Sequence, residues 1–222
     1  MLLRVGSRRC QASSERDMAR SPLKKRSGNA AEDIVRAAER LFGEDGVSLV
    51  SLRQIAIAAN QVNNFAVQYH FGDKDGLIQA IFQRRLPYIE NRRRIQMDEA
   101  RREGFNLYNL NEALFRPIVE EVDENGHRVY VRFLAQIVCD NRTAHHWLKA
   151  SSMVPSIIEI MTEQAKLCPH LSETDLSYRL QLVNAMMFQA IYLADQNEPE
   201  VPKFEAKFTG ALRMAAAAIS AP

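Results

Sequence analysis

The side chains best suited to reading DNA bases are concentrated in one short segment, residues 63–70 of the 222-residue sequence. Val67 and Phe71 lie one helical turn apart, so a helix over this segment can anchor both side chains inward. The outer face then carries the side chains of Asn63, Asn64, Phe65, Gln68 and Tyr69. Asn and Gln can form paired hydrogen bonds with N6 and N7 of adenine, and Phe65 or Ala66 can contact a thymine methyl. This pattern indicates a helix suited to the major groove.

Groups that can hold DNA phosphates flank this segment on both sides. Ser51 and Arg53 precede it, and Asp73-Lys74 follows it at the expected start of the next helix. The free amides of a helix N-terminus and the ammonium of Lys74 can both bind phosphate oxygens. A polar surface helix on an all-α bundle, with no DNA partner, would give the same pattern, and this alternative stays open.

Capping signals predict where the supporting helices begin. Asn29 is followed three residues later by Glu32, which is the spacing of a capping box at the start of a helix. Ser51 and Gln54 repeat that spacing at the start of a second, short helix. Asp73 can cap a long fourth helix, which Pro87 should kink because it removes a backbone hydrogen bond.

Two residues indicate the turns between these helices. Gly46 fits the left-handed residue that ends the first helix, and Asn60 tolerates a positive φ in the turn near residues 60–62. A third short helix is then expected over residues 63–70. Two short helices joined by a tight turn, behind a supporting helix, form a helix-turn-helix.

The rest of the sequence is also helical in pattern. The expected helices cover residues 109–121, 128–140, 143–167, 172–195 and 202–219, and Pro117 and Pro155 interrupt two of them. The predicted fold class is therefore all-α, with an N-terminal three-helix helix-turn-helix domain, a C-terminal helical domain and about nine helices. We expect a flexible basic tail over 1–28, within which Met18 is an alternative start, and domains over 29–88 and 89–222.

Charge is distributed unevenly along the chain. Residues 1–95 contain 17 Lys and Arg against 10 Asp and Glu, whereas residues 96–222 contain 12 against 17. A basic front on an acidic body suits a polyanionic partner such as double-stranded DNA. The tail alone holds 8 Lys and Arg against 2 Asp and Glu, so a basic tail without a partner is the alternative.

The composition excludes several classes of protein. With 46% hydrophobic and 25% charged residues, the chain is neither fully disordered nor fibrous. No apolar run approaches the roughly 20 residues that cross a bilayer, and no apolar signal segment follows Met1. The three cysteines, Cys10, Cys139 and Cys168, lack paired spacing, which predicts a reducing compartment. We therefore expect a cytoplasmic protein with no membrane partner.

The run from Ile34 to Leu77 contains AERLF at 38–42, Gly46, SLRQIA at 51–56 and YHFGDK at 69–74. Together these residues resemble the DNA-binding domain of the tetracycline-repressor (TetR) family. The resemblance implies a homodimeric regulator on a palindromic operator, with a C-terminal domain for ligand binding and dimerisation. It further implies contacts to bases from Asn64, Phe65 and Ala66, and to backbone phosphates from Gln68, His70 and Lys74. The turn is one residue longer than in the family, and Asn60 replaces its common Gly.

The last two expected helices have the apolar spacing of a dimer interface. The residues that recur at intervals of three and four are Leu176, Leu180, Val183, Met187, Ile191, Phe204, Phe208, Ala211 and Ala215. The helix over 172–195 is apolar on its other faces too, so it should be buried on both sides. Two such helices from each subunit would form a four-helix interface about a twofold axis, and an intramolecular core is the alternative.

Aromatic and methionine side chains in the body suit a pocket for a small apolar ligand. The candidates are Phe105, Tyr108, Phe115, Tyr130, Phe133, Gln136, Ile137, Trp147, Met153, Met161 and Met186. A plain helical core uses the same residue types, so core and pocket remain alternatives at each position.

The sequence offers no motif for catalysis, a cofactor or a metal ion. It contains no Gly-x-Gly-x-x-Gly, P-loop or Gly-x-Ser-x-Gly motif, and His145 and His146 point to different helix faces. We therefore expect a transcriptional regulator that is no enzyme, a ligand-responsive repressor acting as a homodimer on a palindromic operator. The alternative is a helical small-molecule-binding or protein-interaction module without operator recognition.

Overall fold

The computed structural model describes residues 30–61, 63, 65–123, 126–197 and 201–221. All regular secondary structure in these residues is helical, and the predicted all-α fold class is confirmed. The helices are α1 (Ala30–Asp45), α2 (Leu52–Ala58), α3 (Ala66–Phe71), α4 (Lys74–Glu103), α5 (Leu107–Val119), α6 (Val129–Cys139), α7 (Ala144–Ser151), α8 (Pro155–Leu167), α9 (Glu173–Asn197) and α10 (Val201–Ser220). Asn29, Met18 and the rest of the predicted tail lie outside the described residues.

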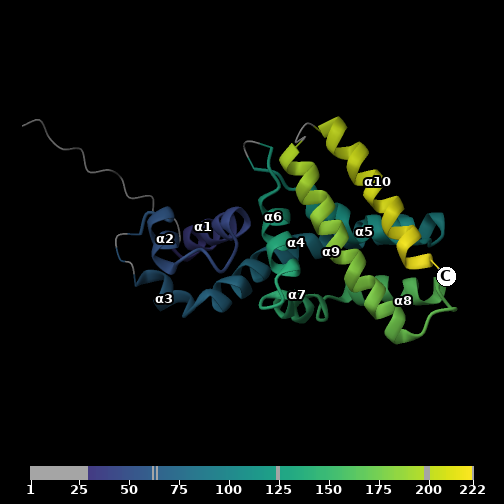
Figure 1. Cartoon of the computed structure of the whole chain (residues 1–222), viewed down its shortest axis with the longest axis horizontal. Coiled ribbons are helices and arrows are strands. Elements are labelled where there is room, and N and C mark those ends of the chain that lie inside the picture. The colour runs from purple at the N-terminus through teal and green to yellow at the C-terminus, as the bar shows by residue number, and fades with distance from the viewer. Residues whose placement is uncertain (1–29, 62, 64, 124–125, 198–200, 222) are drawn as a thin grey trace, which may run out of the picture.

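The helices form a small group and a larger one, joined by α4 (Figure 1). We call the described residues 30–73, which contain α1, α2 and α3, the head, and the helices from α4 onward the body. α9 and α10 lie side by side and pack on α6 and α5 respectively, while α1 packs along α6. The expected boundary between residues 88 and 89 falls inside α4, so this helix extends on both sides of it.

The local signals read from the sequence operate in the head. The Ser51 hydroxyl accepts the Gln54 amide, and the Gln54 side chain accepts the Ser51 amide, so this capping box is confirmed. Asp73 caps α4 by accepting the amide of Gly76 at 2.9 Å. Gly46 and Asn60 both adopt the positive φ that was expected, 83° and 53°.

In the body, two of the expected helices begin or divide differently from the sequence prediction. The helix expected over 143–167 is two helices, α7 and α8, and Pro155 is the first residue of α8 because its missing N–H is not needed there. The helix expected from residue 109 begins at Leu107, since Asn106 and Asn109 form a reciprocal capping box that the prediction missed.

The head and the body share one continuous apolar core. Phe42 and Ile55 of the head are fully buried, as are Phe133 and Phe188 of the body. Gly43 lets α1 approach α6 closely, because a Cβ there would lie 3.0 Å from both the Cβ of Arg132 and the backbone nitrogen of Phe133. None of the helices in the described residues combines the length and apolar character that a membrane span requires.

Candidate nucleic-acid interface

The turn between α2 and α3 fixes how α3 is presented. The amide of Gln61 donates to the Ala56 carbonyl, and the Gln61 side chain donates to the Ala59 carbonyl at 2.9 Å. Val67, on the inner face of α3, is fully buried. Val67, with the half-buried Ala66 and Phe71, holds α3 against the rest of the head, which leaves the side chains of Gln68, Tyr69 and His70 outward.

The outward face of α3 carries two large aromatic side chains. Phe65, the N-cap residue of α3, is 71% exposed, and Tyr69, one turn later, is 85% exposed. Gln68 and His70 are also exposed, whereas Ala66 is half-buried. Large apolar groups gathered on a surface mark a binding site more often than a solvated face, so this surface fits a macromolecular partner.

Asn63 holds the start of α3. Its Oδ1 accepts the amide of Phe65 at 2.9 Å, and its carbonyl accepts the amide of Ala66 at 3.0 Å. α3 therefore begins at Ala66, three residues later than expected, and the Asn63 side chain acts as a local cap. Asn64, which the resemblance places against bases, lies outside the described residues.

Lys74 makes contacts that the sequence did not reveal. Its Nζ donates to the carbonyl oxygens of Val47 and Ser48, at 2.8 and 3.3 Å, and so ties the first turn of α4 to the loop before α2. The ammonium thus orients the helix-turn-helix, and two of its three donors are already engaged. Ser51 is similarly engaged by its capping box, while the neighbouring Arg53 is exposed.

Gly76 is a further residue that the sequence analysis missed. A Cβ at this position would lie 1.9 Å from the carbonyl oxygen of Phe71. Only glycine allows the end of α3 to sit this close to the start of α4. The signal was the glycine three residues after the Asp73 cap, inside the first turn of a helix where glycine is otherwise disfavoured.

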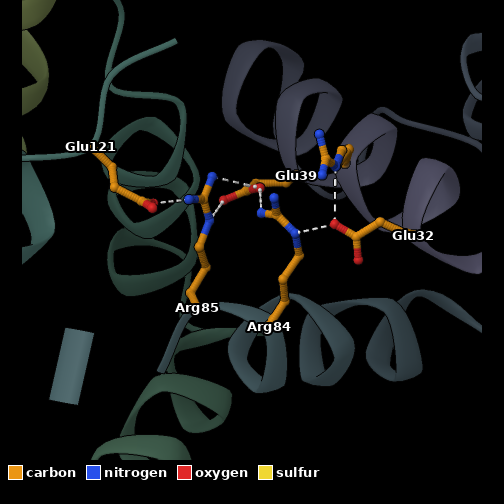
Figure 2. A network of polar contacts seen from close by, with 6 residues as sticks. Glu32, Glu39, Arg84, Arg85 and Glu121 are labelled. Atoms are coloured by element: carbon orange, nitrogen blue, oxygen red, sulfur yellow. Dashed lines mark hydrogen bonds and ion pairs between the residues drawn. The ribbon is translucent and has the colours of Figure 1, made fainter. Parts of the chain in front are cut away.

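A buried acid joins the head to the body, and Figure 2 shows its partners. Glu39 of α1 is 2% exposed and accepts hydrogen bonds from Arg84 at 3.2 Å and from Arg85 at 2.6 and 3.0 Å. Arg84 also bonds Glu32 at 2.7 Å, and Arg85 also pairs with Glu121 after α5. We call Glu32, Glu39, Arg84, Arg85 and Glu121 the Glu39 cluster.

The arginines of the Glu39 cluster also affect the ionisation of one of its partly exposed glutamates. The hydrogen bond from Arg84 holds the pKa of Glu32 below its ordinary value. The Arg85 guanidinium also lies 5.4 Å from the ring centroid of Tyr130, which packs it against α6. The cluster therefore ties α1, α4, α6 and the segment after α5 into one joint. The signal in the sequence was a glutamate, Glu39, directly beside the apolar stripe of α1.

A second joint links the start of α4 to α7. The His146 Nε2 lies 3.1 Å from the Asp75 Oδ1, and His146 is only 6% exposed while the Asp75 side chain is 64% exposed. Asp75 belongs to the first turn of α4, beside α3. His146 of α7 therefore contacts the first turn of α4, which directly follows the head.

The side chains predicted to bind ligand are not gathered in one cavity. Phe115, Phe133 and Ile137 are fully buried core residues, and Tyr130 and Trp147 are nearly so. Met153 and Met161 are 75% and 45% exposed, and the half-buried positions are Phe105, Tyr108, Gln136 and Met186. Gln136 lies near the turn after α1, 3.4 Å from where a Cβ on Gly46 would be. Most of these positions belong to the core that the sequence left as the alternative.

A groove of about 550 Å³ lies elsewhere on the body, between α4 and α7, and we call it the α4–α7 groove. Its walls combine apolar side chains with a few polar ones: Gln79, Phe82, Gln83, Leu86, Pro87, Glu90, His146, Lys149, Ala150, Met153, Val154 and Pro155. Met153 alone among the predicted ligand residues lines it. Its mostly apolar lining with few polar groups is typical of a small-molecule site.

The nine residues predicted for the dimer interface are all covered within the subunit. They range from fully buried Met187, Ile191, Phe204 and Ala215 to Leu180 at 9% exposure. They lie where α9 and α10 pack on one another and on the body, as in the intramolecular alternative. Other side chains of the two helices face outward, and the large apolar ones are Tyr178, Leu182, Leu193, Val201 and Met214.

A short exposed helix, set by a tight turn on a three-helix head that is tied to a helical body, defines a DNA-binding transcriptional regulator. Residues 34–81 match the model of bacterial regulatory proteins of the TetR family, and residues 112–221 match the tetracyclin repressor-like C-terminal domain. The chain belongs to the TetR family.

One solved structure that is similar to the chain comes from Mesorhizobium loti and is described as a TetR-family transcriptional regulator. It is 15% identical, the match covers 87% of this chain and 98% of that chain, and the TM-score is 0.44. No curated protein matches the chain significantly.

Proposed function

We propose that the protein is a homodimeric repressor that binds a palindromic operator and releases it when a small ligand occupies the body. The observation that carries this proposal is the exposed aromatic and amide face of α3 opposite the buried anchor Val67. Such a face fits the major groove, where amide side chains read adenine and apolar groups contact thymine methyls.

Within this proposal the residues of the head and of the first turn of α4 divide into three roles. Phe65, Ala66, Gln68 and the neighbouring Asn64 read bases, while Arg53, Tyr69 and His70 contact phosphates. Asn63, Ser51 and Lys74 contribute mainly by orienting α3 and the start of α4, because their polar atoms are already engaged in the head. This division moves two predicted phosphate ligands, Ser51 and Lys74, into a supporting role.

The dimer would form through the outward faces of α9 and α10. Tyr178, Leu182 and Leu193 give α9 an exposed apolar stripe, and Met214 extends it on α10. Gly210 of α10 leaves open space, since a Cβ there would meet nothing within 4 Å. A second copy related by a twofold axis would bury this stripe against the same stripe of the first copy. The two heads would then be separated by one helical turn of DNA, about 34–36 Å, or a multiple of it.

Coupling between ligand and DNA would pass through α4, because α4 carries contacts to both parts. Arg84 and Arg85 bind the head through Glu39, and Asp75 contacts α7 through His146. A ligand that favours one orientation of α4 then changes operator affinity, and DNA changes ligand affinity by the same factor.

Selection of bound fragments from random double-stranded DNA tests the proposal. We expect a palindromic sequence that binds at least about a thousandfold more tightly than random DNA, with affinity falling steeply as salt rises. Gln68→Ala should flatten the preference at one base pair of each half-site, whereas Arg53→Ala should weaken all sequences equally. Equal binding to all fragments would favour the alternative, a helical binding module without operator recognition.

A further inference from the structure

An anion-binding position borders the α4–α7 groove and is filled by one of the protein's own side chains. Glu90 of α4 accepts the Ser156 amide at 3.3 Å and the Ser156 hydroxyl at 2.5 Å. Ser156 is the second residue of α8, whose N-cap residue Val154 offers no side-chain hydrogen bond. Glu90 therefore supplies, from another helix, the negative charge that a helix N-terminus favours.

Arg93 faces the same position from the interior. It lies one turn beyond Glu90 on α4 and is only 1% exposed. Its Nη1 is 3.5 Å from the Ser156 hydroxyl oxygen and 3.8 Å from the nearer Glu90 oxygen, and its Nη2 donates to the Leu114 carbonyl at 3.3 Å. Its Nε is buried and has no hydrogen-bond partner in the described part of the chain.

This cation is poorly compensated for its depth. A guanidinium binds a carboxylate best through two parallel short hydrogen bonds, whereas both Glu90 oxygens are directed to Ser156. Burial lowers the pKa of Arg93 to about 10, which reflects the cost of holding its charge away from water. The position therefore has the hydrogen-bond donors of an anion site. The Glu90 carboxylate that occupies it is oriented toward Ser156 and makes no short hydrogen bond with Arg93.

We propose that the ligand of the α4–α7 groove is a small monocarboxylic acid with an apolar body, whose carboxylate displaces Glu90 from Ser156 and Arg93. The inference rests on the ligand response of the proposed function. The apolar body would lie along Phe82, Leu86 and Val154, which line the groove beside Glu90. A carboxylate in place of Glu90 would meet Ser156 and the Nη1 of Arg93, the two groups that face Glu90.

The exchange conserves buried charge. The ligand brings one negative charge to Arg93 while Glu90, whose side chain is 18% exposed, turns outward to solvent. Glu90 is then an internal competitor of the ligand, so removing its charge should tighten carboxylate binding. An organic cation would behave in the opposite way, because it would need the Glu90 charge.

The first experiment titrates the full chain with three probes that share an eight-carbon chain, namely octanoate, octanol and octylamine. Trp147 is the single tryptophan of the sequence, and it adjoins His146 and lies 6.2 Å, ring to ring, from Phe82 of the groove wall. Its fluorescence therefore reports occupancy. We expect octanoate to bind at least about tenfold more tightly than the other two. Equal affinities, or tightest binding of octylamine, would overturn the proposal.

Variants then test the positions of the charges. Glu90→Gln should tighten octanoate about tenfold and leave octanol unchanged, and Arg93→Met should remove the preference for octanoate. Lys149→Gln removes the other cation of the groove wall and should keep that preference, because the proposal assigns the carboxylate to Arg93 and not to Lys149. Lys166→Gln, at an exposed position of α8 outside the groove, is the control. If Arg93→Met does not fold, as judged by circular dichroism, Glu90→Gln and Lys149→Gln decide: unchanged or weaker octanoate binding in the first, or loss of the preference in the second, overturns the inference.

These titrations contain no DNA, so the two proposals can fail separately. Octanoate binding with the expected variant pattern, but no effect on operator affinity, would leave this site standing and remove the ligand response. Specific operator binding without any carboxylate preference would support the proposed DNA binding and overturn the carboxylate site.

Discussion

Two buried charges of this chain are held in opposite ways. Glu39, at the joint between head and body, is 2% exposed and receives three hydrogen bonds from Arg84 and Arg85, none longer than 3.2 Å. Arg93, inside the body, is 1% exposed and has long contacts and one N–H without a hydrogen-bond partner among the described residues. The difference teaches that burial alone does not separate a structural charge from a candidate site, whereas the completeness of hydrogen bonding does.

The largest expected loss of stability comes from removing Glu39, the charge whose hydrogen bonds are complete. Glu39→Ala leaves Arg84 and Arg85 partly buried without their shared carboxylate, and should lower the free energy of unfolding by about 3 kcal/mol. Urea denaturation followed by circular dichroism measures this loss. Arg40→Ala, an exposed arginine on the same helix that pairs with Glu44 outside the cluster, is the control and should change stability by less than about 0.5 kcal/mol.

Removing Arg93, the charge whose hydrogen bonds are incomplete, should change the free energy of unfolding much less. Arg93→Met replaces poorly paired donors by an apolar side chain of similar length, and Glu90 keeps its bonds to Ser156. We expect a change of less than about 1 kcal/mol in either direction by the same denaturation. A loss as large as that of Glu39→Ala would show that Arg93 stabilises the body as Glu39 stabilises the joint.

Low pH tests the contribution of Glu32, a partly exposed member of the Glu39 cluster. The pKa of Glu32 is lowered by Arg84, so its contribution is complete above the unfolded value, about 4.3, and is lost as pH falls through the lower folded value. Because Glu32 is more than a third exposed, this contribution should not exceed about 1 kcal/mol. The melting temperature of Glu32→Gln should therefore fall less steeply below pH 4.3 than that of the parent, and parallel curves would contradict this.

The smallest effect is expected at the exposed joint. Asp75→Asn keeps the shape of the partner of His146 but removes its charge, and most of the Asp75 side chain is in water. Stability should change by at most about 0.5 kcal/mol. If this contact carries coupling, the ratio of operator affinities with and without ligand should nevertheless change, which fluorescence anisotropy on labelled operator measures.

The sequence predicted the features of the head that depend on near neighbours. The Ser51 cap, the Asp73 cap and the positive φ of Asn60 are each set by residues within a few positions, so spacing suffices to find them. Fold class followed from apolar periodicity for the same reason.

Features set by distant partners were beyond such reasoning. Leu176 and Phe204 have interface spacing, yet periodicity does not say whether a neighbouring helix or a second subunit covers them. The Glu39 cluster joins residues far apart in the chain, and Lys74 contacts a loop 26 residues away. The proposed reading and ligand contacts stay predictions because they involve partners outside the chain.

The length of α4 has a mechanical consequence. Lys74 and Glu90 are separated by 16 positions on one continuous helix, which corresponds to about 24 Å at 1.5 Å per residue. A tilt of about 10° about Glu90 would swing the first turn by roughly 4 Å. In a symmetric dimer the first turn of α4 would move in both subunits and carry α3 with it. A displacement of a few ångströms in each subunit would change the distance between the two α3 helices, which would then no longer match successive major grooves at their fixed spacing.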